Sequence, residues 1–109
     1  MPAYPALPRS ANPAHGAAAV AGATSTTLVA APAAGKWRSY LLIQNVGTES
    51  AWIRVDGAAA TAASPCILLA AGASFGGTAH VVQGEIRCIR DGAATGDVAL
   101  SVVVEELDR

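Results

Sequence analysis

Short runs of alternating apolar and polar residues extend over most of the chain after residue 26, and they predict β-strands. Residues 97–106 alternate most clearly, because Val98, Leu100, Val102 and Val104 fall on one face of an extended strand. Glycine-containing turns separate the runs. Short strands that recur in this way predict an all-β fold, a small antiparallel β-sandwich or barrel of about six to eight short strands.

The strand-like runs cover residues 26–31, 37–46, 51–55, 66–70, 74–75, 81–82, 84–90 and 97–106. Residues 41–43 (Leu-Leu-Ile) are apolar on both faces, which is typical of a central strand. The runs at residues 40–45 and 51–57 flank a polar loop that contains a glycine, which is the pattern of a hairpin. No segment has a convincing helical period.

Residues 1–25 differ from the rest in composition. Four prolines, at positions 2, 5, 8 and 13, are followed by a stretch of alanine and glycine. Such a segment buries too little apolar area to repay its ordering entropy. We therefore expect a flexible N-terminal arm over residues 1–25 and a β-sandwich domain over residues 26–109. A short helix over residues 14–21 is a weaker alternative. On a partner's surface the arm would be anchored by Tyr4, Leu7 and Val20.

The size and charge of the chain narrow its function. A chain of 109 residues forms one domain, and much of its apolar content is alanine, so its core is small. Apolar surface shared with neighbouring copies would offset that deficit, which favours an oligomer or a lattice-bound protein. The net charge is −1 and the basic residues are scattered, so we expect arginines on ordinary solvated strand faces and no nucleic-acid binding. No apolar run has the ~20 residues of a membrane span, and no secretory signal is evident, so we expect no membrane association and synthesis in the cytoplasm.

The sequence offers little chemistry. Cys66 and Cys88 lie within apolar runs, so we expect reduced, buried thiols, and a disulfide is the alternative. The two cysteines and two histidines do not form a metal-ligand pattern. Ser74, His80 and Asp91 follow one another along the chain, but no nucleophile-elbow motif surrounds the serine. We expect no catalytic residue, no cofactor and no metal.

Aromatic residues are the most informative large side chains. They pack into a core or sheet face, or they supply a subunit interface at low entropy cost. Trp52 and Arg54 share the face opposite to the inward-facing Ile53 and Val55, so Trp52 is the better interface candidate. The complete set of interface candidates is Tyr4, Leu7, Val20, Trp37, Tyr40, Trp52 and Arg54.

Residues 36–55, with Tyr-Leu-Leu-Ile-Gln-Asn at 40–45 and Trp-Ile-Arg-Val at 52–55, resemble a recurrent pattern in small virion proteins of tailed bacteriophages and prophages. Those proteins share a threonine-rich entry strand, which corresponds to residues 26–31. They also share a small-residue segment and a turn with an aromatic, which correspond to residues 57–63 and 69–75. The resemblance spans about residues 26–104 and implies a phage structural β-domain without catalytic content.

From this resemblance we expect a capsid decoration (cement) protein that binds the outer shell and bridges capsid subunits. Its partners would be the major capsid protein or other virion proteins and further copies of itself, most plausibly as a trimer. It would be assembled in the bacterial cytoplasm and reside in the virion. The alternatives are a neck, tail or fibre-base component, and a displayed host-binding or carbohydrate-binding β-domain.

Overall fold

The computed structural model describes residues 10–63, 65–77 and 81–108, and it confirms the all-β prediction. The described residues contain eight strands and no helix. The strands are β1 (Ser10–Ala21), β2 (Thr26–Val29), β3 (Lys36–Asn45), β4 (Ala51–Arg54), β5 (Ile67–Leu69), β6 (Ser74–Gly77), β7 (Ile86–Arg90) and β8 (Val98–Asp108).

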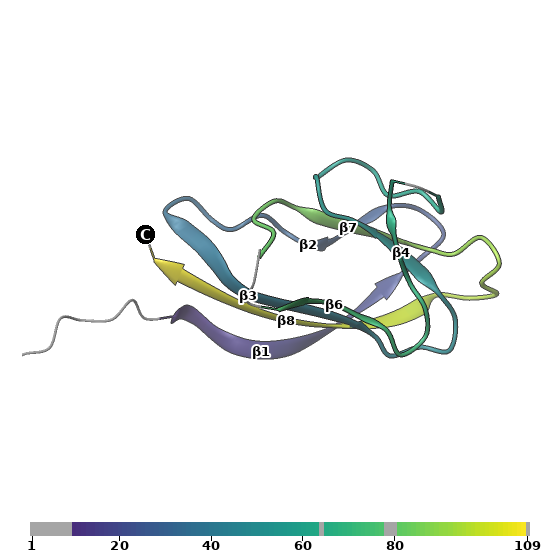
Figure 1. Cartoon of the computed structure of the whole chain (residues 1–109), viewed down its shortest axis with the longest axis horizontal. Helices are drawn as coiled ribbons and strands as arrows, with labels where there is room; N and C mark the ends of the chain where they lie inside the picture. The colour runs from purple at the N-terminus through teal and green to yellow at the C-terminus, as the bar shows by residue number, and fades with distance from the viewer. Residues whose placement is uncertain (1–9, 64, 78–80, 109) are drawn as a thin grey trace, which may run out of the picture.

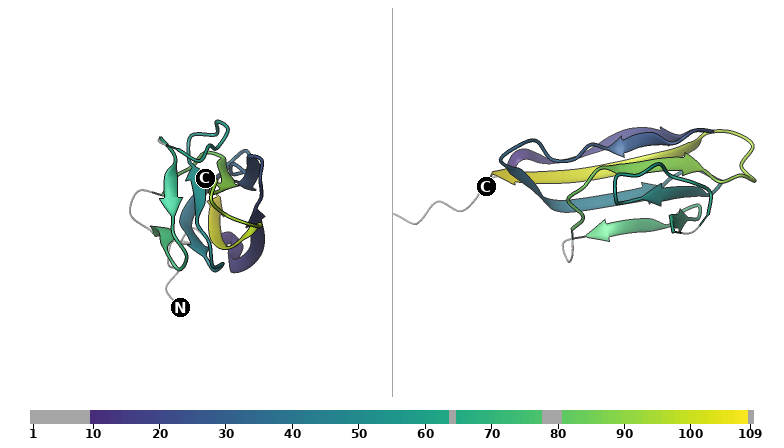
Figure 2. Two further views of the ribbon diagram at one scale, coloured as in Figure 1. Left: turned by 90° about the vertical axis from the view of Figure 1, so that its right-hand side faces the viewer. Right: turned by 90° about the horizontal axis from the view of Figure 1, so that it is seen from above.

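The strands form two antiparallel sheets that face each other as a small β-sandwich (Figures 1 and 2). Sheet A has the strand order β1-β8-β3-β6, and sheet B has the order β2-β7-β4-β5. The long strands β1, β3 and β8 lie in sheet A, whereas every strand of sheet B has five residues or fewer. Sheet A is therefore the longer layer of the sandwich.

The core lies between the two sheets and follows the alternation that the sequence predicts. From sheet A, Leu41, Ile43 and Leu100 are 1% exposed or less. Ile53 and Ile86 of sheet B are fully buried against them. The face predicted for residues 98–104 is confirmed, because Val98, Leu100 and Val102 are buried and Val104 packs against the core.

The predicted hairpin between residues 40–45 and 51–57 is wrong. β3 pairs with β6 and β8, and β4 pairs with β5 and β7, so the loop between β3 and β4 crosses from sheet A to sheet B. Asn45 holds this corner, since its buried side-chain amide donates to the carbonyls of Glu49 (2.7 Å) and Leu69 (2.9 Å). Its Oδ1 accepts a bond from the Gly47 amide at 2.9 Å. The polar loop identifies a reversal of the chain, but the pairing partners are decided by burial of both strands.

The predicted boundary between a flexible arm and a domain near residue 26 does not hold, and neither does the short helix over residues 14–21. Residues 10–21 form β1, which pairs with β8 from Ser10↔Leu107 to Ala21↔Val98. Ala21 is fully buried, and the backbone ladder with β8 repays an ordering cost that the segment could not repay alone. Residues 1–9, with Tyr4 and Leu7, lie outside the described residues.

Candidate docking surface

The outer side of sheet A presents an extended apolar surface, which we call the A face. Cross-strand partners in antiparallel strands share a face, so the register from Val20↔Ala99 to Leu42↔Val103 assigns its members. The A face consists of Ala18, Val20, Trp37, Tyr40, Leu42, Gln44, Val46, Ala99, Ser101, Val103, Glu105 and Leu107. Three of its side chains are among the exposed large hydrophobic residues: Val20 (57%), Val46 (56%) and Trp37 (38%).

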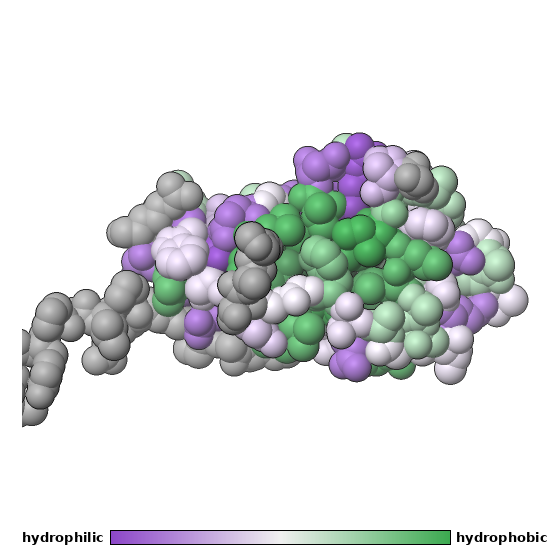
Figure 3. Space-filling view, in the orientation of Figure 1, coloured by the Kyte–Doolittle hydropathy of each residue, from purple (hydrophilic) through white to green (hydrophobic). Residues whose placement is uncertain are grey.

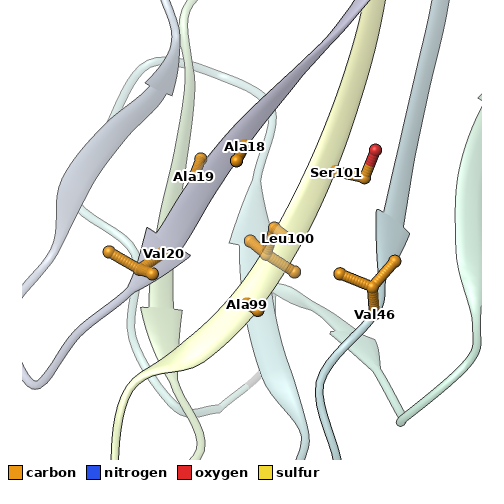
Figure 4. Close-up of a pocket in the computed structure, with 7 residues that line it drawn as sticks. All are labelled: Ala18, Ala19, Val20, Val46, Ala99, Leu100 and Ser101. Carbon is orange, nitrogen blue, oxygen red and sulfur yellow. The ribbon is translucent and has the colours of Figure 1, made fainter.

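An apolar hollow of about 460 Å³ lies at one end of the A face (Figure 4). Residues Ala18, Ala19 and Val20 of β1, residues Ala99, Leu100 and Ser101 of β8, and Val46 after β3 line it. No charged or aromatic side chain contributes to this lining. The hollow is therefore suited to aliphatic or uncharged groups and not to an ion.

Charged groups of sheet A gather at the opposite end. Lys36 forms an ion pair with Asp108 at 2.8 Å. Glu105 accepts a hydrogen bond from the Ser39 hydroxyl at 2.9 Å. By the register, Lys36 and Asp108 fall on the opposite face of sheet A from Trp37 and Leu107, so of these groups a partner along the A face would meet Glu105 at this end and aliphatic groups at the other.

The structure separates the predicted interface residues. Trp37, Tyr40 and Val20 all lie on the A face, with Val20 towards the opposite end from Trp37. Val20 was assigned to the arm and instead lies in β1. Trp52 and Arg54 lie on the outer side of sheet B, on the other side of the sandwich. The seven candidates therefore do not form one surface.

On sheet B, the polar groups of Trp52 and Arg54 have partners within the same chain. The half-buried Trp52 donates from Nε1 to Asp91 at 2.8 Å. Arg54 Nε donates to Asp56 Oδ1 at 2.7 Å. This hydrogen bond from Arg54, together with a bond from the Ala58 amide, lowers the pKa of Asp56 to about 2. The hydrogen-bonding groups of Trp52 and Arg54 are thus paired within the chain and do not require a partner protein.

Arg38 is the residue that sequence analysis misjudged most. It was expected on a solvated strand face, but it is fully buried. Its guanidinium donates to the carbonyls of Val82, Gly84 (3.2 Å) and Ala30 (2.8 Å). A register shift between Arg38 and Tyr40 turns this side chain inward, and a bulge of this kind leaves no clear sequence signal.

The surroundings of Arg38 hold its charge inside the sandwich. Burial lowers the pKa of Arg38, and the negative charge of Glu106 opposes that effect. Gln83 brackets its backbone, because Oε1 accepts from the Arg38 amide and Nε2 donates to its carbonyl, both at 2.6 Å. The hydrogen bonds from the Arg38 guanidinium connect the carbonyls of residues 30, 82 and 84 to sheet A.

Both cysteines are buried, as predicted, and both thiols are free. Burial raises the pKa of Cys88, which lies 3.7 Å from the Thr26 hydroxyl. Cys66 accepts from the Thr61 amide at 3.3 Å. The raised pKa keeps the buried Cys88 thiol protonated and makes it a poor nucleophile.

The other reactive residues do not gather in the described part of the chain. Ser74 is exposed on β6, Asp91 accepts the Trp52 bond, and His80 lies outside the described residues. Within residues 10–63, 65–77 and 81–108, no group of three or more His, Cys, Asp or Glu side chains could hold a metal ion. Across the same ranges, no helix is long and apolar enough to cross a membrane.

Comparison of the chain with protein-family models, with curated proteins and with solved structures found no match in any of the three.

Proposed function

We propose that this protein is a structural component of a tailed-phage particle, a decoration protein that binds the outer shell of the head and bridges capsid subunits. The observation that carries the proposal is the A face, a long apolar surface on the larger sheet of a small sandwich. An apolar patch of this kind is typical of a protein–protein contact. The resemblance of residues 36–55 to small virion proteins gives the partner class.

The aromatic part of the A face supplies the proposed shell contact. Trp37 is 38% exposed, and Tyr40 and Leu42 follow it along β3 on the same side. Aromatic side chains bury much area for little entropy, so a few of them carry most of an interface's free energy. Each copy would bury modest area, and symmetric engagement of neighbouring copies would multiply the binding strength.

The carbohydrate-binding alternative would need aromatic side chains along a groove. The hollow on the A face has none in its lining, so the hollow does not favour that alternative. A neck or tail component would use the same kind of surface and differ in copy number. We propose the head surface with the major capsid protein as partner, a virion location and no enzymatic activity.

The test adds purified protein to heads that lack it and measures binding by co-sedimentation and copy number by quantitative mass spectrometry. Hundreds of copies per particle would support decoration, and about six to twelve would place the protein at a neck or tail instead. Trp37→Glu should abolish binding. Leu68→Glu, at a residue on sheet B that is 49% exposed, is the matched control and should bind normally. Equal binding by both variants would contradict the proposal.

A further inference from the structure

The hollow on the A face is bordered by the two most exposed large hydrophobic residues in the described part of the chain, Val20 and Val46. Both side chains rise beside β8, with the small residues Ala18, Ala99 and Ser101 between them (Figure 4). In the orientation of Figure 3, hydrophobic residues gather over the middle of the molecule, and polar residues lie towards its ends and along its upper border. Apolar surface of this kind gains free energy when another chain covers it.

The lining restricts the occupant. It is aliphatic apart from the hydroxyl of Ser101, so a charged side chain would lose its hydration without a compensating partner. The volume of about 460 Å³ accommodates a few side chains and not a folded domain. A short apolar peptide segment fits these limits.

Residues 1–9 of this chain have that chemistry. Tyr4 and Leu7 are apolar, and prolines at positions 2, 5 and 8 favour the polyproline II conformation. That conformation has three residues per turn, so residues three apart, such as Tyr4 and Leu7, fall on one side of it. Proline also lowers the entropy that a peptide loses on binding.

The hollow of the same molecule is out of reach for this pair. The arm joins the fold at Ser10, which pairs with Leu107, whereas the hollow begins at Ala18, about 26 Å further along β1. Leu7 is three residues from Ser10 and extends at most about 11 Å, and the chain would also have to reverse direction. Tyr4 and Leu7 therefore cannot both enter their own hollow, but they can enter that of a neighbour.

We propose that Tyr4 and Leu7 of one copy dock in the hollow of a second copy, bordered by Val20 and Val46. Val20 then belongs to the receiving surface and not to the arm. Reciprocal exchange closes a dimer, and head-to-tail exchange closes a ring. The proposal concerns purified protein alone, so it stands or fails independently of binding to a shell.

The first test is a cross-linking experiment on the full chain. Tyr4 is replaced by the photoreactive amino acid benzoylphenylalanine, and ¹⁴N-labelled and ¹⁵N-labelled protein are mixed before irradiation. We expect cross-linked peptides that join residue 4 of one isotope to residues 18–20 or 99–101 of the other. Cross-links confined to a single isotope, or directed to other surfaces, would overturn the proposal.

The second test measures association by sedimentation equilibrium. Tyr4→Ala/Leu7→Ala and Val46→Asp should each weaken self-association about tenfold or more, while Leu68→Asp on sheet B leaves it unchanged. Thermal melting checks that each variant is folded. A wild-type protein that stays monomeric up to about 100 μM would contradict the exchange, because that concentration exceeds typical dissociation constants of oligomers.

Mixing the two weakened variants separates arm exchange from simple packing of two A faces. The arm variant keeps an intact hollow and the hollow variant keeps an intact arm, so each mixed pair regains one complete contact. We expect the mixture to associate more strongly than either variant alone. If the mixture is as weak as its components, the arm does not occupy the hollow. A segment of a different protein would then be the better candidate for the hollow.

Discussion

The outer sides of the two sheets differ in how their side chains are satisfied. On sheet B, Arg54 is bonded to Asp56, Arg87 to Ser25, and Trp52 to Asp91, so these polar groups of the surface are already paired. On sheet A, the middle of the outer side carries aliphatic and small residues, and Val20 and Val46 are more than half exposed. The second surface gains more free energy by meeting another chain, because three of its large hydrophobic residues are exposed, whereas Leu68 is the exposed large hydrophobic residue on the described part of sheet B.

The arginines of the two sheets also differ in the direction in which their side chains point. Sheet B turns Arg54 and Arg87 outward on the solvent side. Sheet A turns Arg38 into the sandwich, where three carbonyls accept its hydrogen bonds. An inward arginine keeps charge off the A face and ties the neighbouring loops to β3, at the cost of desolvating a cation.

The largest effect should come from breaking this contrast at Arg38. Arg38→Met retains the aliphatic bulk but leaves the carbonyls of residues 30, 82 and 84 without their donor. We expect the free energy of unfolding to fall by about 3 kcal/mol or more. Urea denaturation followed by tryptophan fluorescence measures it. Arg54→Met, at an ion pair on the surface, is the control and should change the free energy of unfolding only slightly, because such pairs are screened by solvent. Equal losses would show that burial of Arg38 does not matter to stability.

Replacing each of the two tryptophans should have an effect of intermediate size, and the effect should differ between the two sheets. Trp52→Ala should lower the free energy of unfolding by about 2 kcal/mol, because Trp52 is the cross-strand partner of Leu68 and Ile89 and its Nε1 donates to Asp91. Trp37→Ala should cost less than about 1 kcal/mol, because its side chain is more exposed.

Thermal melting of both tryptophan variants measures their stability, and sedimentation measures their association, so the two effects can be separated. The sequence made Trp52 the better interface candidate, so Trp52→Ala was expected to weaken assembly with little effect on the fold. If that pattern is observed, Trp52 on sheet B contacts another copy and does not stabilise the fold, and our assignment of the interface to sheet A is wrong.

The smallest effect concerns pH and the pair of Arg54 and Asp56. The pKa of Asp56 is lowered from 3.8 to about 2, mainly by the hydrogen bond from Arg54. A lowered carboxyl pKa contributes stability above pH 3.8, and that contribution is lost as the pH falls towards 2. Asp56 is exposed and Arg54 is partly exposed, so solvent screens the pair and the change in stability should be slight.

An NMR titration of the Asp56 carboxyl carbon tests this shift directly. In Arg54→Met we expect the midpoint to rise towards 3.8, although the Ala58 amide should hold it somewhat below that value. A midpoint that is the same in both proteins would show that Arg54 does not lower the pKa of Asp56.

The fold class, most strand positions and the inward face of β8 could be predicted from the sequence, because alternation of apolar and polar residues is a local property of an extended chain. It also indicated that Cys66 and Cys88 are buried, since both lie in apolar runs. Trp37 and Tyr40 were named only as interface candidates, and their place on the same side of β3 follows from the register with β8.

Tertiary structure decided what depends on partners distant in the chain. The segment of prolines, alanines and glycines has low intrinsic preference for order, yet residues 10–21 become a strand because β8 supplies a complete ladder. The loop after Asn45 was read as a hairpin, but the side-chain bonds of Asn45 and the burial of both strands send it to the other sheet. Arg38 turned inward through a single register shift. Strand pairing, sheet assignment and the burial of a charge depend on contacts between residues that are distant in the chain. A local sequence pattern carries no information about those contacts.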